Sequence, residues 1–272
     1  MSELQTNKPI FPPIRACIFD VDGLLINSED IYTEIYNNIL HSYGKPSLPW
    51  SVKAKQQSRG RSGMLQLLDW AQLPISYDEW TAKVASQYEL FRQCHPLPGV
   101  PALLSDLSSK TTSAVHIAIA SSATSKTFAI KTSHLPSITS AFPQKCRVFG
   151  DDPAMRGSMH TWGAGRGEVR PEECLVFEDS VAGVEAGRRA GMRVCWVPHV
   201  GLRGVWRGRE STVLEGRSDE VEEGDGVIVG DGEQEGNKEE KKQLWSTDGW
   251  AEMLMSLEGF NYEQYGIQMK QG

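Results

Sequence analysis

The chain has 272 residues and a formal net charge of −7, and it is long enough to bury a substantial hydrophobic core. Twelve acids and four bases lie between residues 210 and 242, so this segment carries a net charge of −8 and the rest of the chain +1. The lack of a Lys/Arg cluster argues against a nucleic-acid partner, and the lack of a run of about 18 apolar residues argues against a membrane protein.

Five cysteines without a Cys-x-x-Cys pair, three of them inside apolar runs, are typical of reduced thiols in a protein core. The first fifteen residues contain neither an apolar signal sequence nor an Arg-rich amphipathic pattern. We therefore expect a cytoplasmic monomer that binds neither nucleic acid nor membranes.

An apolar run over residues 14–19 predicts a buried strand, and it ends in Asp20-Val21-Asp22-Gly23. The end of a strand and the loop after it can aim both carboxylates into one crevice, and Gly23 allows the backbone to turn there. Open α/β sheets bind ligands beyond the carboxyl ends of their strands. Asp20 and Asp22 are therefore the first candidate site residues.

Residues 27–96 have helical patterns throughout. Ser28 is expected to cap a helix whose apolar residues recur at a spacing of four, and Ser76-x-x-Glu79 has the form of a capping box. We expect this segment to be a helical cap over the crevice, where Arg61 could reach a bound substrate.

Beyond Pro98-Gly99 the pattern changes to short apolar runs that alternate with helical or loop segments. These runs, at residues 115–120, 147–149, 174–177 and 193–197, predict strands of a parallel sheet with right-handed crossovers. The predicted fold class is α/β, with a core made of residues 1–26 and 97–205 and an inserted helical cap over residues 27–96.

The last part of the chain differs in composition from this core. Residues 206–243 are rich in Gly, Glu and Asp and are expected to form a disordered linker. Residues 244–272 are expected to form an amphipathic helix and a tail, from the spacing of Trp245, Trp250, Met253, Leu254 and Leu257.

Two further predicted strands end in residues suited to phosphate chemistry. Ser121 and Ser122 follow residues 115–120, where hydroxyl and backbone N–H groups can bind phosphate oxygens. Glu178 and Asp179 end the strand at residues 174–177, and clustered carboxylates suit Mg²⁺, which prefers hard oxygen ligands and often shares them with a phosphate.

A carboxylate can attack phosphorus directly, and we assign that role to Asp20. Asp22 would protonate the leaving alkoxide and later accept a proton from the attacking water. The Asp20 carboxylate, the Asp22 backbone carbonyl and Asp179 would hold Mg²⁺, with Glu178 in or near the shell.

The motifs resemble those of the haloacid dehalogenase (HAD) superfamily. They are Phe19-Asp20-Val21-Asp22-Gly23, Ser121 after residues 117–120, and Val176-Phe177-Glu178-Asp179-Ser180 with Gly183. The match spans roughly residues 14–200, and the helical insert looks like the cap of the sugar-phosphatase and β-phosphoglucomutase-like branch, where pseudouridine-5′-phosphatases and glycerol-phosphate phosphatases look nearest. The resemblance implies a Rossmann-like core, Mg²⁺, and hydrolysis of a phosphate monoester through an aspartyl phosphate.

One segment departs from the family pattern. After Gly150-Asp151-Asp152-Pro153 the family usually has Gly-Lys-Pro-x-Pro-Asp and a full helix, whereas this chain continues from Gly157 into a Gly/Arg-rich stretch that ends at Arg170. The expected lysine is missing, and the loss of one preorganised electrostatic group typically costs about 3 to 4 kcal/mol of transition-state stabilisation. We expect Arg156, which adjoins Gly157, to bind the substrate in its place, with Arg166, Lys131 and Lys126 as other candidates.

Three functions are compatible with these features. The first is a Mg²⁺-dependent phosphatase acting on a small phosphorylated metabolite, a sugar or polyol phosphate. The second is a catalytically weak or inactive HAD-like protein that binds phosphorylated ligands or a partner. The third is a phosphomutase, which would transfer the phosphoryl group instead of releasing it.

Overall fold

The computed structural model describes residues 11–57, 59–153, 169–218 and 244–270. Its centre is a seven-stranded sheet in the order β3-β2-β1-β4-β5-β7-β6, in which every neighbouring pair is parallel except β6 with β7. The predicted Rossmann-like α/β fold is confirmed. The strands are β1 (Ala16–Phe19), β2 (His116–Ser121), β3 (Arg147–Phe149), β4 (Cys174–Glu178), β5 (Arg193–Trp196), β6 (Leu244–Trp245) and β7 (Ala251–Met253).

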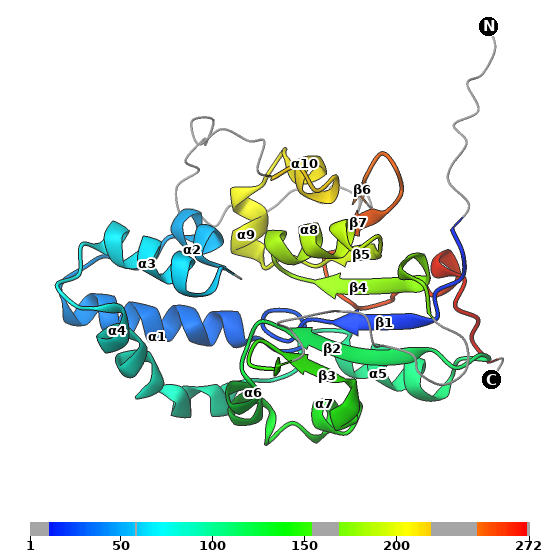
Figure 1. The fold of residues 1–272 in the computed structure, drawn as a ribbon, viewed down its shortest axis with the longest axis horizontal. Coiled ribbons are helices and arrows are strands. Elements are labelled where there is room, and N and C mark those ends of the chain that lie inside the picture. The colour runs from blue at the N-terminus through cyan, green and yellow to red at the C-terminus, as the bar shows by residue number, and fades with distance from the viewer. Residues whose placement is uncertain (1–10, 58, 154–168, 219–243, 271–272) are drawn as a thin grey trace, which may run out of the picture.

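Helices cover both faces of this sheet (Figure 1). Phe19 and Phe177 contribute to one apolar cluster, whereas Val176 and Val194, on strands of the same sheet, contribute to a second. This division follows from the alternation of side chains along a strand, and it explains why these strands read as continuous apolar runs. The core helices are α5 (Val100–Ser109), α6 (Ser125–Thr132), α7 (Pro136–Thr139), α8 (Val181–Arg189), α9 (Val200–Val205) and α10 (Glu210–Leu214), with 3-10 turns η2 (Gln144–Cys146), η4 (Pro171–Glu173) and η6 (Glu263–Tyr265).

A helical insert separates β1 from α5. It lies beyond the carboxyl ends of the strands, to one side of the core in Figure 1. Its elements are α1 (Ser28–Ser42), α2 (Trp50–Gln56), α3 (Gly60–Ala71), α4 (Tyr77–Ala85) and the 3-10 helix η1 (Tyr88–Gln93).

Of the two helix caps predicted for the insert, one is confirmed and the other is wrong. The capping box is present, since Ser76 accepts from the Glu79 backbone N–H and the Glu79 carboxylate accepts from that of Ser76. The prediction that Ser28 caps α1 is wrong. Asn27 is the N-cap, and the Ser28 hydroxyl instead donates to the carboxylate of Asp22.

The prediction of an amphipathic helix over residues 244–272 is also wrong. β6 and β7 extend the sheet as a hairpin, whose turn is closed by hydrogen bonds between Ser246 and Ala251. Gly249 in this turn has φ +74°, a conformation that glycine adopts without strain and that ends a helix.

The predicted disordered segment begins too early. α10 forms over Glu210–Leu214, and it buries Val213 and Leu214 in the second apolar cluster. Residues 219–243 lie outside the described part of the chain. Within the described part, no helix is long and apolar enough to cross a membrane.

Candidate active site

Three carboxylates meet at the carboxyl edge of the sheet. Asp20 directly follows β1, Glu178 is the last residue of β4, and Asp179 comes next. Each offers one oxygen such that the three lie within 4.8 Å of one another. The parallel register causes this meeting, because Phe19 pairs with Phe177 and the Asp20 N–H donates to the Phe177 carbonyl over 3.0 Å. A group of hard oxygen donors at this spacing fits a divalent cation such as Mg²⁺.

Two glycines leave the space that these carboxylates occupy. A methyl group at Gly183 would overlap the carboxylate of Glu178, and one at Gly23 would overlap Oδ2 of Asp179. Gly23 also has φ +83°, which L-residues with side chains rarely adopt. Glu178 is held in its place by the N–H and hydroxyl of Ser180, at 2.9 and 3.1 Å. The two glycines and Ser180 thus allow the carboxylates of Glu178 and Asp179 to take up these positions.

Burial and mutual repulsion make these acids hard to ionise together. Desolvation raises the pKa of Asp20 and of Asp179 well above the usual range, and repulsion from Glu178 raises both further. Desolvation likewise raises the pKa of Glu178 to about 7, against the opposing effect of its hydrogen bonds from Ser180. A bound cation would compensate this concentration of negative charge.

We expect the metal-free protein to lose stability as the pH rises from 6 to 8. A carboxyl group whose pKa is raised by folding favours the folded state at low pH, and this contribution is lost as the pH rises through the folded pKa, about 7 for Glu178. The titration of Glu178 alone should lower the free energy of unfolding by about 1 kcal/mol over this range in EDTA. Mg²⁺ should remove most of this fall, because it stabilises the ionised carboxylates.

Urea unfolding at both pH values, with EDTA or with Mg²⁺, measures this difference. Equal stability at pH 6 and 8 in EDTA would show that folding does not raise the pKa values of the three acids. The same fall with and without Mg²⁺ would show that they bind no cation.

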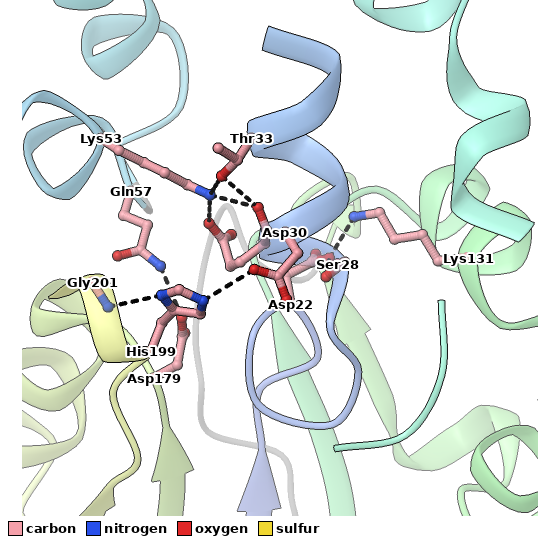
Figure 2. A network of polar contacts seen from close by, with 11 residues as sticks. Asp22, Ser28, Asp30, Thr33, Lys53, Gln57, Lys131, Asp179, His199 and Gly201 are labelled. Carbon is pink, nitrogen blue, oxygen red and sulfur yellow. Dashed lines mark hydrogen bonds and ion pairs between the residues drawn. The ribbon is translucent and has the colours of Figure 1, made fainter. Parts of the chain in front are cut away.

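The side chain of Asp22 is held apart from this group. Its Oδ1 accepts from the Ser28 hydroxyl and from Lys131 Nζ, which is 2.6 Å away. Lys131 lies near the end of α6 with its side chain fully buried, and its ammonium group packs over the rings of Tyr32 and Phe91. These contacts fix the Asp22 carboxylate in one orientation (Figure 2).

Ser121 also lies at the site. It is the last residue of β2 and is buried, its hydroxyl donates to the Asp20 carboxylate, and its Oγ accepts from the Ala123 N–H over 3.3 Å. Ser122 is exposed. Its carbonyl lies so close to Gly150 that a side chain there would overlap it.

Of the two arginines predicted to bind substrate, the structure describes only Arg61, and it is not placed among the carboxylates. Arg61 is exposed on α3, and its guanidinium lies over the ring of Tyr77, 4.3 Å from the centroid. Arg156 lies outside the described residues. Lys131, another of the predicted cations, does lie near the site, through its ion pair with Asp22.

One face of α2 contacts the site and was missed by sequence reasoning. Trp50 stacks on His199 at 4.4 Å, Lys53 pairs with Glu29 at 2.8 Å, and Gln57 donates to Asp179 Oδ2 at 2.8 Å. Figure 2 shows Lys53 reaching from α2 toward Thr33 on α1, and Gln57, just after α2, reaching toward Asp179 of the core. The spacing of positions 50 and 53 on one helix face was the available signal for the first two, whereas Gln57 follows the helix in an extended conformation.

His199 adds a second contact between the core and the insert. Its Nδ1 accepts from the Gly201 N–H at 3.0 Å, and its Nε2 lies 3.1 Å from Asp30 Oδ1 on α1. Gly201 has no side chain because one would overlap the indole of Trp50. Through His199, the core therefore contacts both α1 and α2 of the insert.

Comparison with known proteins agrees with this geometry. The family model of haloacid dehalogenase-like hydrolases matches residues 17–197. A probable pseudouridine-5′-phosphatase of Saccharomyces cerevisiae is 39% identical over 201 residues, which cover 68% of this chain and 83% of that protein. The mitochondrial (DL)-glycerol-3-phosphatase 1 of Arabidopsis thaliana is 33% identical over 197 residues, covering 68% and 64%.

Solved structures show the same fold. A crystal structure of CbbY from Rhodobacter sphaeroides with xylulose-(1,5)bisphosphate superposes with a TM-score of 0.51 at 16% identity, covering 70% of this chain and 89% of that one. A haloacid dehalogenase-like protein of Agrobacterium tumefaciens has a TM-score of 0.50 at 24% identity, covering 68% and 82%. With its sheet, its acidic motifs and the family model in agreement, this chain belongs to the haloacid dehalogenase-like hydrolases.

Proposed function

We propose that this protein is a Mg²⁺-dependent phosphatase that hydrolyses the phosphate ester of a small sugar or polyol. The observation that carries the proposal is the group of three carboxylates within 4.8 Å, with Ser121 beside Asp20. The names of the relatives, which include phosphatases of pseudouridine phosphate and of glycerol 3-phosphate, support this substrate class.

The carboxylates of Asp20, Glu178 and Asp179, with the backbone carbonyl of Asp22, would hold Mg²⁺. When bound, the ion neutralises the acids and lowers the repulsion between Asp20 and an anionic phosphate. The fit of the site to a cation rests on its oxygen donors and on the raised pKa of each of its three acids.

In the first step, a carboxylate oxygen of Asp20 attacks phosphorus and the bond from phosphorus to the ester oxygen breaks. Asp22 gives its proton to the leaving alkoxide, which departs as the alcohol. In the second step, Asp22 takes a proton from water as the water attacks phosphorus, so that inorganic phosphate leaves and the Asp20 carboxylate is restored. The Ser121 hydroxyl binds a phosphoryl oxygen.

The helical insert serves as a cap over this site. The contacts of Trp50 with His199 and of Gln57 with Asp179 hold the insert over the carboxylates. A closed insert would exclude bulk water from the aspartyl phosphate, so that one positioned water molecule completes the reaction.

Lys131 positions the acid that protonates the leaving group. Replacing it with Met should lower kcat about 10- to 100-fold, because Asp22 loses the donor that orients it. The loss should be greater for an alkyl phosphate than for p-nitrophenyl phosphate, since nitrophenolate leaves without a proton. Lys126→Met, an exposed change on the same helix, is the matched control.

Rates for both substrates and melting temperatures of both variants test this role. An equal loss on both substrates would show that Lys131 does not act through Asp22. A normal rate for Lys131→Met on the alkyl ester would remove the residue from the mechanism altogether.

The function itself is tested by phosphate release from purified protein with Mg²⁺. The panel contains pseudouridine 5′-phosphate, glycerol 3-phosphate, ribose 5-phosphate and p-nitrophenyl phosphate. We expect turnover of at least one metabolite, lost in EDTA and restored by excess Mg²⁺. Transfer of the phosphoryl group to a second sugar, with no net release, would indicate a phosphomutase.

A second candidate is a family member that binds phosphorylated ligands without turnover. It is favoured by the segment after Pro153, which lacks the family's Gly-Lys-Pro-x-Pro-Asp motif. Calorimetry that detects binding of these metabolites, together with no phosphate release above that of Asp20→Asn, would support this candidate over the phosphatase.

A further inference from the structure

Gln57 follows α2 and carries a buried amide that is paired at one end only. The residue is 7% exposed, and its Nε2 donates to Asp179 Oδ2 over 2.8 Å. No donor in the described part of the chain reaches its Oε1, which is itself buried. A buried carbonyl oxygen without a donor is unfavourable and rare in folded proteins. It indicates a partner that arrives with a ligand.

The position of that partner is set by the geometry of the amide. Oε1 and Nε2 share one carbon atom, and Nε2 is bound to Asp179. A donor that reaches Oε1 therefore lies next to Asp179, at the edge of the carboxylate group. The helical insert lies on this side of the carboxylates (Figure 2), and a substrate whose phosphate binds at Asp20 would extend its organic part toward the insert.

The chemistry of the partner follows from which polar groups of Lys53 and Gln57 already have hydrogen-bond partners within the protein. Lys53 Nζ contacts three acceptors, which are the Glu29 carboxylate, the Glu29 carbonyl and the Thr33 hydroxyl. Its charge is thus neutralised within the protein. The free group is an acceptor, which repels phosphate oxygens and attracts a neutral donor.

We propose that Gln57 Oε1 accepts a hydrogen bond from a hydroxyl group on the alcohol part of the substrate, so that Gln57 selects polyol and sugar phosphates over alkyl phosphates. This inference rests on the proposed phosphatase function. An alkyl phosphate leaves the buried acceptor unpaired, and a site built to bind a hydroxyl group discriminates strongly against an analogue without one.

The test compares kcat/KM for glycerol 3-phosphate and propyl phosphate, two esters with the same carbon chain. The wild type should prefer glycerol 3-phosphate, and Gln57→Met should reduce this preference about 10-fold. Methionine matches the length of glutamine without its amide. Loss of the contact with Asp179 affects both substrates alike, and so it cancels in the ratio. Gln56→Met, one position earlier, should keep the wild-type ratio.

A second variant covers the case in which Gln57→Met folds poorly. Gln57→Glu keeps an oxygen acceptor but places a negative charge beside Asp179, so both rates should fall while the preference for glycerol 3-phosphate remains. Melting temperatures of all variants report on folding.

The inference and the proposed function fail in different ways. A wild-type enzyme that hydrolyses p-nitrophenyl phosphate but shows no preference between the two esters, or a Gln57→Met variant with an unchanged ratio, overturns the inference alone. No Mg²⁺-dependent release from any of the three compounds contradicts the phosphatase function instead.

Discussion

Replacing Asp20 with Asn should lower phosphate release by at least about 10⁴-fold, because the amide cannot form the acyl phosphate. The substitution has almost the same shape, so binding and folding should survive. Stability of the metal-free protein should even rise, since repulsion from Glu178 and Asp22 acts on the Asp20 carboxylate and is relieved by a neutral side chain. Rate assays and urea unfolding of the same sample measure the two effects.

The matched control is Asp69→Asn, a change of the same kind on the exposed surface of α3. It should leave both rate and stability unchanged. A variant at Asp20 that retains a tenth of the wild-type rate would contradict the nucleophilic role. A variant that loses both rate and stability would show that Asp20 is needed for the fold.

Replacing Asp179 with Asn should weaken metal binding by at least about 100-fold, because it removes a charged ligand from the group of three. Even outer-shell changes at metal sites cost 10- to 100-fold in affinity or activity. The Mg²⁺ concentration needed for half-maximal activity should rise by this factor. The contact with Gln57 can remain, since Asn keeps an oxygen acceptor where Asp179 accepts from the amide.

Calorimetric titration with Mg²⁺ checks this change without using the reaction. The control is Glu34→Gln on the exposed side of α1, which removes the same unit of charge far from the sheet edge. Equal Mg²⁺ affinity in wild type and Asp179→Asn would place the metal elsewhere.

The acidic site could be predicted from the sequence because simple sheet geometry determines it. Asp20 and Glu178 each end an apolar run, and the carboxyl ends of neighbouring parallel strands share one edge. No knowledge of side-chain packing was needed for this step.

Contacts between elements could not be predicted in the same way. Lys131 reaches Asp22 across 109 positions in the chain, and its burial depends on how α6 packs against α1 and η1. Gln57 reaches Asp179 only because the insert folds back over the sheet. Periodicity gives the face of each helix but not its neighbour.

The C-terminal hairpin shows the limit of periodicity itself. The apolar residues at 250, 253, 254 and 257 fit a helix, yet the turn chemistry of Ser246 and Gly249 favours a hairpin and prevailed. As a strand, β7 pairs with the edge of β5 and satisfies its backbone hydrogen-bonding groups. A helix at the same place would leave that edge of the sheet unpaired.

The proposed reaction requires one divalent cation between Asp20, Glu178 and Asp179. Diffraction at the manganese absorption edge, from crystals soaked in MnCl₂, locates such an ion directly. We expect one strong anomalous peak bonded to carboxylate oxygens of Asp20 and Asp179 and adjacent to Glu178. No peak among these three residues at saturating Mn²⁺, or a peak bound elsewhere, would contradict the account.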